Sequence, residues 1–309
     1  MKPAHKNLPK VIILMACYNG KAYVAQQIES IAQQKNCVTK LVISIDLSDD
    51  GTLDYIKDLN KQYAFIHLLS YGHRYGSAAA NFYRLIMETD IQGYDFIAYS
   101  DQDDIWNDDK LSNHIQLARK NNADGVSSNV MAFWTDNRET LITKAQPQKE
   151  WDYLFESPGP GCTFLITPWL LNKVRDQLLN EKSPAKKVAF HDWLTYAVCR
   201  AYGHKWIIDS VPSVRYRQHG NNVFGANSGF KAKIARLLTL KQGWYKEEVI
   251  KICALSVSIS KNTKIYNMLS LCKSKSICSQ YKLLPYVLQA RRKFFDRVLL
   301  GLIILSFQF

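Results

Sequence analysis

An apolar run that ends in three carboxylates constrains the fold of this chain more than any other stretch. It is FIAYSDQDDIW, residues 96–106, in which Asp101, Asp103 and Asp104 follow the apolar residues directly. A short apolar run bounded by a polar turn is typical of a buried strand, and open α/β sheets bind ligands beyond the carboxyl ends of their strands. Clustered carboxylates repel one another and need a counter-charge, for which a divalent cation carrying a diphosphate is suited. The same residues also fit a solvated acidic loop that caps the next helix.

The N-terminal segments predict a parallel sheet. Residues 11–17 form a fully apolar run, residues 24–31 have helical spacing, and residues 41–45 form a second apolar run. Strand, helix and strand in this order make a βαβ unit, which implies a parallel sheet with a right-handed crossover. Asp46 follows the second strand and is a candidate for contact with a base or ribose. Its loop begins like an EF-hand, but Lys57 stands where a bidentate Glu is required, so we reject a calcium site.

Four later segments have features of a ligand site. Residues 71–79, YGHRYGSAA, carry His73 and Arg74 and fit either a phosphate cradle or a surface loop. Residues 135–157 are polar and predict an irregular loop over the site, and residues 159–162 form a Gly-rich turn where a ligand can approach the backbone. Asp192 lies at the start of a predicted helix. An Asp at this position is also explained by a role as N-cap, because its side chain can accept a hydrogen bond from the first turn. Residues 214–223 form a cation-rich strand and loop, which is unusual for a core element.

Taken together, seven segments resemble the glycosyltransferase family 2 enzymes with a GT-A fold, and in particular their bacterial rhamnosyltransferase-like branch. They are ACYNG (16–20), DLSDDGT (46–52), NF (81–82), SDQDDIW (100–106), GCT (161–163), HDW (191–193) and YRQHGNN (216–222). Their order and spacing are those that the family shows. The resemblance implies an α/β fold with a Rossmann-like, mostly parallel sheet flanked by helices. It also implies a nucleotide-sugar donor in the sheet crevice and a divalent cation, Mg²⁺ or Mn²⁺.

The resemblance assigns roles by position. Asp192 matches the catalytic base, and Asp103 and Asp101 match the metal ligands, with His219 as a further ligand or, alternatively, a loop histidine bonded to backbone. On the donor side the matching positions are Tyr18, Asn19, Asp46, Arg74, Asp101, Gln102, Asp104 and Arg217. On the acceptor side they are Trp106, Gly161, Cys162 and Trp193.

The chemistry expected of these residues is a single displacement. A carboxylate takes the proton of the attacking sugar hydroxyl, and a metal ion stabilises the leaving diphosphate, so the anomeric centre inverts. The Gln-x-x-Arg-Trp signature of processive family members is absent, which favours transfer of one sugar. Many members have the sequence Asp-Asp-Gly-Ser after the second strand, whereas here Asp46, Leu47 and Ser48 precede Asp49. The sequence therefore does not determine how the nucleotide base is bound. The resemblance implies dTDP-L-rhamnose or a UDP-hexose as donor, and a glycan or lipid-linked glycan of a bacterial surface polysaccharide as acceptor; the sequence does not fix the sugar.

The net charge of +13 belongs almost entirely to the C-terminal part of the chain. Residues 226–309 contain 15 Lys and Arg against 3 Asp and Glu, whereas residues 1–225 contain 25 against 24. We therefore expect a catalytic domain at 1–225 and a basic, partly amphipathic helical region at 226–309. Such asymmetry indicates a nucleic-acid or membrane contact, and no nucleic-acid motif is present.

The end of this region predicts an interfacial helix on an anionic membrane. Its basic residues and apolar neighbours are Arg291, Arg292, Lys293, Arg297, Phe294, Phe295, Leu299, Leu300, Ile303 and Ile304. The alternative is a helix packed on the catalytic domain. If the membrane interpretation holds, a chain that ends near Asn227 loses membrane binding and keeps the donor site.

The cysteine pattern and the length of the apolar runs indicate the cellular compartment of the protein. The seven Cys include no CxxC pair, which favours a reducing compartment. Residues 11–17 are too short and wrongly flanked for a signal peptide. The apolar run 298–309 has 12 residues, where a membrane-spanning helix needs roughly 20. We expect a cytoplasmic protein, peripheral at the inner face of the cytoplasmic membrane.

Two other functions compete with sugar transfer. A catalytically inactive, nucleotide-sugar-binding anchor for a membrane assembly is disfavoured because Asp103 and Asp192 are both present. A sugar-1-phosphate nucleotidyltransferase would need a Gly-rich, Arg-bearing loop after the first strand, and residues 18–21, YNGK, are not one.

Overall fold

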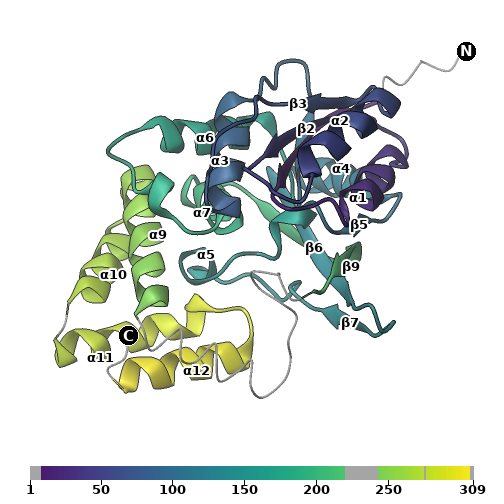
Figure 1. Ribbon diagram of the computed structural model, residues 1–309. Helices are drawn as coiled ribbons and strands as arrows, with labels where there is room; N and C mark the ends of the chain where they lie inside the picture. Colours follow the sequence, from purple (N-terminus) through teal and green to yellow (C-terminus); the bar gives the residue numbers. More distant parts are fainter. Residues whose placement is uncertain (1–7, 220–242, 275, 307–309) are drawn as a thin grey trace, which may run out of the picture.

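A nine-stranded mixed sheet forms the centre of the computed structural model, which describes residues 8–219, 243–274 and 276–306. The strands lie in the order β3-β2-β1-β4-β8-β6-β9-β5, and β7 pairs with β6 (Figure 1). Their bounds are β1 Lys10–Cys17, β2 Val38–Ile45, β3 Ile66–Leu68, β4 Phe96–Ser100, β5 Ile105–Trp106, β6 Gly125–Phe133, β7 Glu139–Ile142, β8 Leu165–Ile166 and β9 Trp206–Arg217.

The N-terminal half of the sheet is parallel, as the βαβ pattern predicts. β1 runs parallel to β2 and β4, and β2 runs parallel to β3. The connecting helices are α1 Val24–Ala32, α2 Thr52–Gln62, α3 Ala78–Glu88 and α4 Lys110–Asn121. Alternate residues of a strand face opposite sides of a sheet, so the apolar run of β1 serves two cores. Ile13 packs in a core with α1, α2 and α4, and Ile12 packs in another with α3.

The other half of the sheet is not parallel throughout, which qualifies the prediction of a mostly parallel sheet. β8 is antiparallel to both β4 and β6, and β5 is antiparallel to β9. β6 and β9 are parallel to each other. The predicted irregular loop at 135–157 is also wrong, because it contains β7 and the buried helix α5, Asp152–Phe155.

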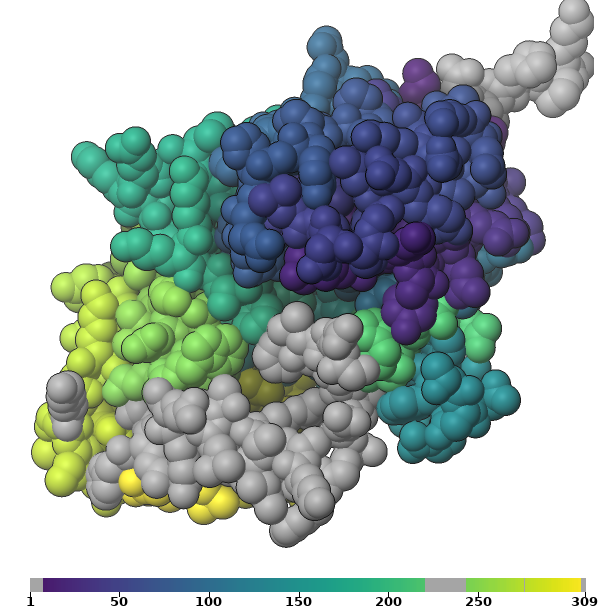
Figure 2. All heavy atoms as spheres, in the orientation of Figure 1, coloured from purple at the N-terminus to yellow at the C-terminus, as the bar shows by residue number. Residues whose placement is uncertain are grey.

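The C-terminal helices pack against the sheet domain and share its core. They are α9 Trp244–Ser260, α10 Thr263–Lys273, α11 Ile277–Ala290 and α12 Phe294–Leu305. Val249 and Ile252 of α9 are fully buried in the same core as Leu194 and Val198 of α7, His191–Ala201. In Figure 2 the light-green surface of α9 and α10 abuts the teal surface of the sheet domain.

This shared core corrects one expectation. A chain ending near Asn227 would remove α9, which packs on α7, the helix that carries Asp192, and would expose the shared core. We therefore do not expect such a chain to keep an intact donor site. The expected division near residue 225 lies outside the described residues. That division therefore stays a prediction.

The segment predicted as an interfacial helix does form a helix, α12, but several residues expected at its exposed face are buried. The chain leaves helix at residues 291–293, and Arg291 and Arg292 turn into the protein instead of toward solvent. Leu300, Ile303 and Ile304 are also buried, so they are not available for membrane insertion. α12 does expose an apolar face made of Phe294, Phe295, Val298, Leu299, Leu302 and Leu305. Within the described ranges, no helix combines the length and the apolar character needed to cross a membrane.

Candidate active site

The three carboxylates lie where the sequence placed them, in the turn after a buried central strand. β4 is buried throughout, the turn occupies residues 101–104, and β5 follows it. Asp101 and Asp103 are partly buried and Asp104 is fully buried. The alternative of a loop capping the next helix is wrong, because β5 intervenes and α4 begins only at Lys110.

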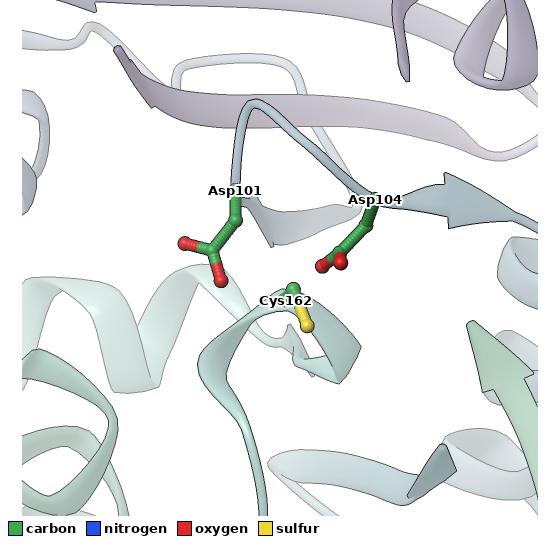
Figure 3. A group of neighbouring side chains, drawn as sticks. All are labelled: Asp101, Asp104 and Cys162. Atoms are coloured by element: carbon green, nitrogen blue, oxygen red, sulfur yellow. The ribbon is translucent and has the colours of Figure 1, made fainter. Parts of the chain in front are cut away.

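Asp101, Asp104 and Cys162 converge below this turn (Figure 3). One potential ligand atom from each lies within 4.8 Å of the others. Burial, followed by repulsion from Asp103 and Asp192, raises the pKa of Asp101 to about 7. Burial, followed by repulsion from Asp103 and Asp101, raises the pKa of Asp104 well above its usual range.

These features fit a hard divalent cation. Among the described residues the buried Oδ2 of Asp104 finds no hydrogen-bond partner, and a cation beside the turn would stabilise the charged form of every carboxyl there. Burial raises the pKa of the Cys162 thiol well above its usual value. Because a thiolate rather than a thiol ligates metals, the oxygens of the aspartates are the suitable donors.

Asp103, Arg217 and His219 join the end of β9 to the acidic turn. His219 Nε2 lies 2.7 Å from Asp103 Oδ2, and its ring stacks on Tyr23 with 5.1 Å between centroids. Arg217 donates from Nε to the Asp103 carbonyl at 2.8 Å and from its main-chain N–H to Asp104 Oδ1 at 3.0 Å. The structure thus brings His219 and Asp103 together as the metal prediction requires, and their binding of a metal stays a prediction. The rest of the matching segment, residues 220–222, lies outside the described residues.

Gln102 and Asn19 hold the loop after β1 in place. Gln102 and Tyr18 exchange two hydrogen bonds of 2.8 Å through the Gln102 amide and the Tyr18 main chain. A Cβ at Gly20 would collide with the end of the Gln102 side chain and would displace it from these two hydrogen bonds. Asn19 has φ +46° and accepts a hydrogen bond of 3.1 Å from the Asp49 N–H. Tyr18 keeps 49% of its surface exposed, so its ring is free to meet a ligand.

The Asp46 carboxylate binds the main chain of a neighbouring loop and is not free to bind a nucleotide base without losing these bonds. Its carboxylate accepts main-chain N–H groups of Leu47, Tyr75 and Gly76 at 2.8, 2.8 and 2.9 Å. It is only 5% exposed. This anchors the loop at 71–77 to the end of β2, with Arg74 exposed on it. Direct contact of Asp46 with a base stays a prediction, and so does the role of Arg74.

Asp192 lies at the start of α7, on the other side of residues 161–162 from the acidic turn. The N-cap position belongs to Phe190, so the interpretation of Asp192 as an N-cap is wrong. Burial raises the pKa of Asp192 to about 6, while the Trp193 N–H, the Ser157 side chain and Lys144 act to lower it. A Cβ at Gly161 would lie 3.4 Å from Asp192 Cβ and collide with His191 Nε2. The glycine therefore lets this backbone approach the carboxyl closely.

The four positions assigned to the acceptor side form the wall behind the site. Trp106 is 2% exposed, with Lys110 Nζ 3.7 Å from its ring centroid, and Cys162 is 0% exposed. Trp193 is 5% exposed and donates from Nε1 to the Tyr153 carbonyl at 2.8 Å. Gly161 is buried against α7. The side chains of Trp106, Cys162 and Trp193 are therefore buried, and contact of the four positions with an acceptor stays a prediction.

Sequence reasoning missed two residues beside Asp192. Ser157 and Lys144 both interact with the Asp192 carboxyl, and both come from the stretch expected to be an irregular loop. Burial lowers the pKa of Lys144 to about 8. Neither residue stands in a recognisable motif, so only the tertiary contact identifies them.

With the site described, comparison with known proteins identifies the family. The sequence model of Glycosyl transferase family 2 matches residues 12–177, more than half of the chain. The chain belongs to this family. It is 43% identical over 239 residues to the dTDP-rhamnosyl transferase RfbG of Shigella flexneri, covering 77% of this chain and 83% of that protein. This family 2 protein is a glycosyltransferase, as its sequence predicted.

More distant similarities support the fold. The chain is 30% identical over 165 residues to the UDP-Glc:alpha-D-GlcNAc-diphosphoundecaprenol beta-1,3-glucosyltransferase WfgD of Escherichia coli, covering 52% of this chain and 62% of that one. The crystal structure of S. aureus TarS 1–349 superposes with a TM-score of 0.58 at 11% identity, over 97% of this chain and 80% of that one. The mannosyltransferase PcManGT of Pyrobaculum calidifontis, in complex with GDP-Man and Mn²⁺, gives 0.51 at 13% identity, over 97% and 86%. The predicted fold class is confirmed.

Proposed function

We propose that this glycosyltransferase moves one sugar, with inversion, from a nucleotide-sugar to a glycan or lipid-linked glycan during synthesis of a bacterial surface polysaccharide. The observation that carries the proposal is the meeting of Asp192 and the acidic turn at residues 161–162, where Gly161 packs on Asp192 and Cys162 lies beside Asp101 and Asp104. The donor is dTDP-L-rhamnose, which the similarity to RfbG favours. UDP-glucose is the alternative donor, which the similarity to WfgD favours.

Asp192 acts as the general base in this proposal. With a pKa of about 6 it is mostly ionised at neutral pH and is still a stronger base than an ordinary Asp. It accepts the proton of the acceptor hydroxyl while that oxygen forms a bond to the anomeric carbon. The bond from this carbon to the nucleoside diphosphate breaks at the same time, and its electron pair leaves with the phosphate oxygen. A single attack in line with the leaving group inverts the anomeric configuration.

Asp101 and Asp103 would hold a divalent cation, Mg²⁺ or Mn²⁺, with His219 beside them. Such a cation neutralises the negative charge of the diphosphate. Arg217 supports the turn from behind through its bonds to Asp103 and Asp104. Gln102 and Asn19 order the loop after β1, which leaves the exposed Tyr18 ring to face the nucleotide.

The test combines a binding panel with analysis of the product. Nucleotide-sugars are screened by thermal shift with Mg²⁺, with Mn²⁺ and with chelator, since a ligand that binds only the folded state raises stability. We expect dTDP-L-rhamnose with metal to give the largest shift, and NMR of the product to show inverted configuration. Retention of configuration, or a panel in which no nucleotide-sugar binds, would refute the proposal.

The proposed location is the inner face of the cytoplasmic membrane, with the apolar face of α12 in contact with anionic lipid. Phe294 and Phe295 are 64% and 82% exposed, and Lys293 beside them is also exposed. The net charge of +12 on residues 226–309 complements an anionic surface. An inactive anchoring protein is the competing function, and the ordered Asp103 and Asp192 disfavour it.

A further inference from the structure

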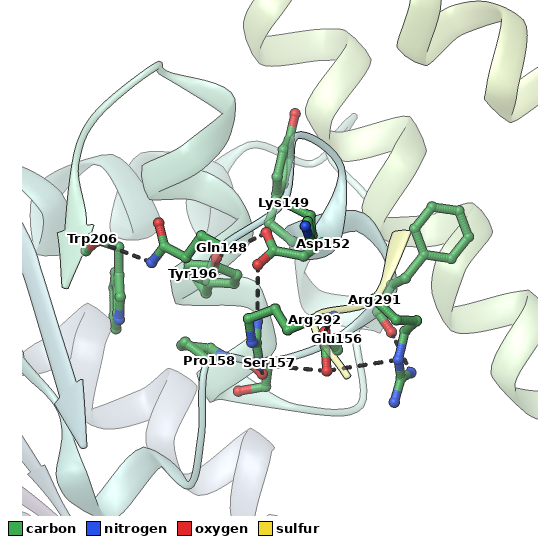
Figure 4. A network of polar contacts seen from close by, with 12 residues as sticks. Gln148, Lys149, Asp152, Glu156, Ser157, Pro158, Tyr196, Trp206, Arg291 and Arg292 are labelled. Atoms are coloured by element: carbon green, nitrogen blue, oxygen red, sulfur yellow. Dashed lines mark hydrogen bonds and ion pairs between the residues drawn. The ribbon is translucent and has the colours of Figure 1, made fainter. Parts of the chain in front are cut away.

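A cluster of largely buried charges connects the C-terminal helices to the segment beside Asp192 (Figure 4). We call it the arginine cluster, and its members are Arg200, Arg291, Arg292, Asp152, Glu156 and Asp296. Three cations face three anions, so the cluster is balanced in charge. Buried charges are tolerated only when they are paired, and this pairing therefore requires a defined arrangement of α5, α7 and the C-terminal helices.

Arg292 is the member that spans the most distant parts of the chain. It lies between α11 and α12, and its side chain is 1% exposed. Its two terminal nitrogens donate to Asp152 Oδ2 at 3.2 Å and to the Ser157 carbonyl at 2.6 Å. Its main-chain N–H donates to Glu156 Oε1 at 2.6 Å. The planar guanidinium makes these contacts with α5 and with residue 157 at once, in a fork that a lysine cannot reproduce.

Asp152 carries the connection onward to α7. Its second oxygen, Oδ1, accepts hydrogen bonds from Tyr196 Oη at 3.0 Å and from Arg200 at 3.2 Å. Tyr196 and Arg200 are on α7, whose second residue is Asp192. One side of Arg292 is thus linked to the helix that bears the proposed base.

The other side of Arg292 is linked to the backbone that faces this base. From Ser157 the chain runs through Gly159, whose φ is +148° and where a Cβ would lie 3.4 Å from the Ser128 carbonyl oxygen and 3.6 Å from Lys144 Cγ. It then reaches Gly161, where a Cβ would stand 3.4 Å from Asp192 Cβ. The Ser157 hydroxyl donates to the Gly159 carbonyl at 2.8 Å, which keeps this short segment compact. Holding the Ser157 carbonyl therefore sets where residues 157–161 lie relative to Asp192.

We propose that Arg292 is a positioning residue for sugar transfer, through which the C-terminal helices fix residues 157–161 against the helix that carries Asp192. The inference rests on the proposed role of Asp192 as base. It assigns the C-terminal region a part in turnover that is separate from any contact with a membrane. Charge pairing alone does not account for Arg292, because its guanidinium also donates a hydrogen bond to the main-chain carbonyl of Ser157, beside the proposed base.

The proposal predicts that turnover and donor binding respond differently. The groups proposed to meet the donor lie after β1, β2, β3 and β4 and at the end of β9, and none of them belongs to the arginine cluster. Release of residues 157–161 changes their position relative to Asp192 and leaves the donor-side groups in place. A shift of about 1 Å in such a group can lower the rate about 10²-fold.

The experiment compares Arg292→Met and Arg292→Lys with wild type and with Arg138→Met. Arg138 is an exposed arginine paired with Asp136 on the far hairpin and serves as the matched control. Donor-binding sites are counted by calorimetry in each preparation, and kcat is expressed per binding site. We expect Arg292→Met to lower kcat by about 10- to 100-fold, with donor KM within about twofold of wild type. Arg292→Lys should recover part of the rate, and Arg138→Met should match wild type.

The outcomes separate this inference from the proposed function. If both Arg292 variants show wild-type kcat per binding site and lose only folded protein, Arg292 merely stabilises the fold and the inference is overturned. If Arg292→Met does not fold, Arg292→Lys alone decides, since wild-type turnover per site in that variant refutes positioning. Asp192→Asn is assayed in parallel. Full activity in Asp192→Asn refutes the proposed base whatever the Arg292 variants do.

Discussion

His219 Nε2 lies 2.7 Å from Asp103 Oδ2, and this contact joins two residues 116 positions apart. It closes the end of β9 onto the turn after β4, in a place where both side chains are mostly buried. A cation bound to Asp103 would lie beside His219. His219 would then either ligate the cation as well or lose its hydrogen bond to Asp103. The contact therefore makes the metal prediction testable at one residue.

Asp103→Ala should abolish sugar transfer and remove the metal dependence of nucleotide binding, because the diphosphate charge loses its nearest compensation. Nucleotide affinity is measured by calorimetry with and without Mg²⁺ or Mn²⁺. Asp108→Ala is the control, since Asp108 pairs with Lys35 at the surface. Wild-type turnover that survives excess chelator would contradict the metal role.

Asp192→Asn should lower kcat by about 10²-fold or more, the range usual for loss of a general base, while donor affinity stays near wild type. Asparagine keeps the size of the side chain and can still accept the Trp193 N–H, which Asp192 Oδ1 accepts at 2.6 Å. Helix capping is not at stake, because Phe190 holds that position. Steady-state kinetics and donor titration check the result, and an unimpaired kcat would place the base elsewhere.

The pH dependence of kcat/KM should show an acidic limb near pH 6. Burial raises the pKa of Asp192 to about 6, and only the ionised carboxyl accepts a proton, so activity rises as pH increases through that value. Lys144→Met removes a cation that lowers this pKa, and the limb should then move to higher pH. Lys120→Met, an exposed substitution at the end of α4, should leave the limb unchanged. A limb that moves down or stays fixed in Lys144→Met would show that Lys144 does not act on the base.

Asp152→Ala should destabilise the fold strongly. Asp152 is 0% exposed and pairs with Arg292 and Arg200, so its removal leaves two buried guanidinium groups without this partner, at a cost of about 3–5 kcal/mol. The free energy of unfolding is measured by urea denaturation. The control is Asp136→Ala, at an exposed pair where little change is expected. Equal stability of the two variants would mean that the arginine cluster does not hold the fold together.

Replacing both Phe294 and Phe295 by Ser in the full-length protein should weaken binding to anionic vesicles. High salt should weaken binding of the wild type without abolishing it, because salt screens the basic residues and leaves the apolar contact. Vesicle co-sedimentation at low and high salt measures both effects. Leu179→Ser is the control, since Leu179 is an exposed apolar residue at the end of helix α6, Pro168–Leu179. Equal binding by all forms, or none by any, would remove the membrane assignment.

The acidic turn and the first strands were predictable because their signals are local. A short, mainly apolar run that a polar turn follows directly, as at 11–17 and 96–100, is typical of a buried strand. The residues after such strands must then gather at one edge of the sheet. Asp101, Asp103 and Asp104 were therefore found from the pattern, and the family resemblance added Asp192.

The partners of Asp46 and the helix at 152–155 were not predictable. Asp46 bonds the main chain of Tyr75 and Gly76, and no side-chain pattern records a main-chain contact between distant loops. α5 is only four residues long, which is too short for helical periodicity to be seen. Its stretch is polar because it carries the buried charges Asp152 and Glu156, whose partners lie elsewhere in the chain.

By itself, the sequence determined the family, the position of the acidic turn and the concentration of positive charge in residues 226–309. Only the tertiary structure decided what that charge does. Arg291 and Arg292 stand in sequence beside Lys293, yet they turn inward to pair with buried carboxylates while Lys293 stays in solvent. The reason is physical: a charged side chain carries the same sign in either place, and whether it is buried depends on partners supplied by α5, far away in the chain.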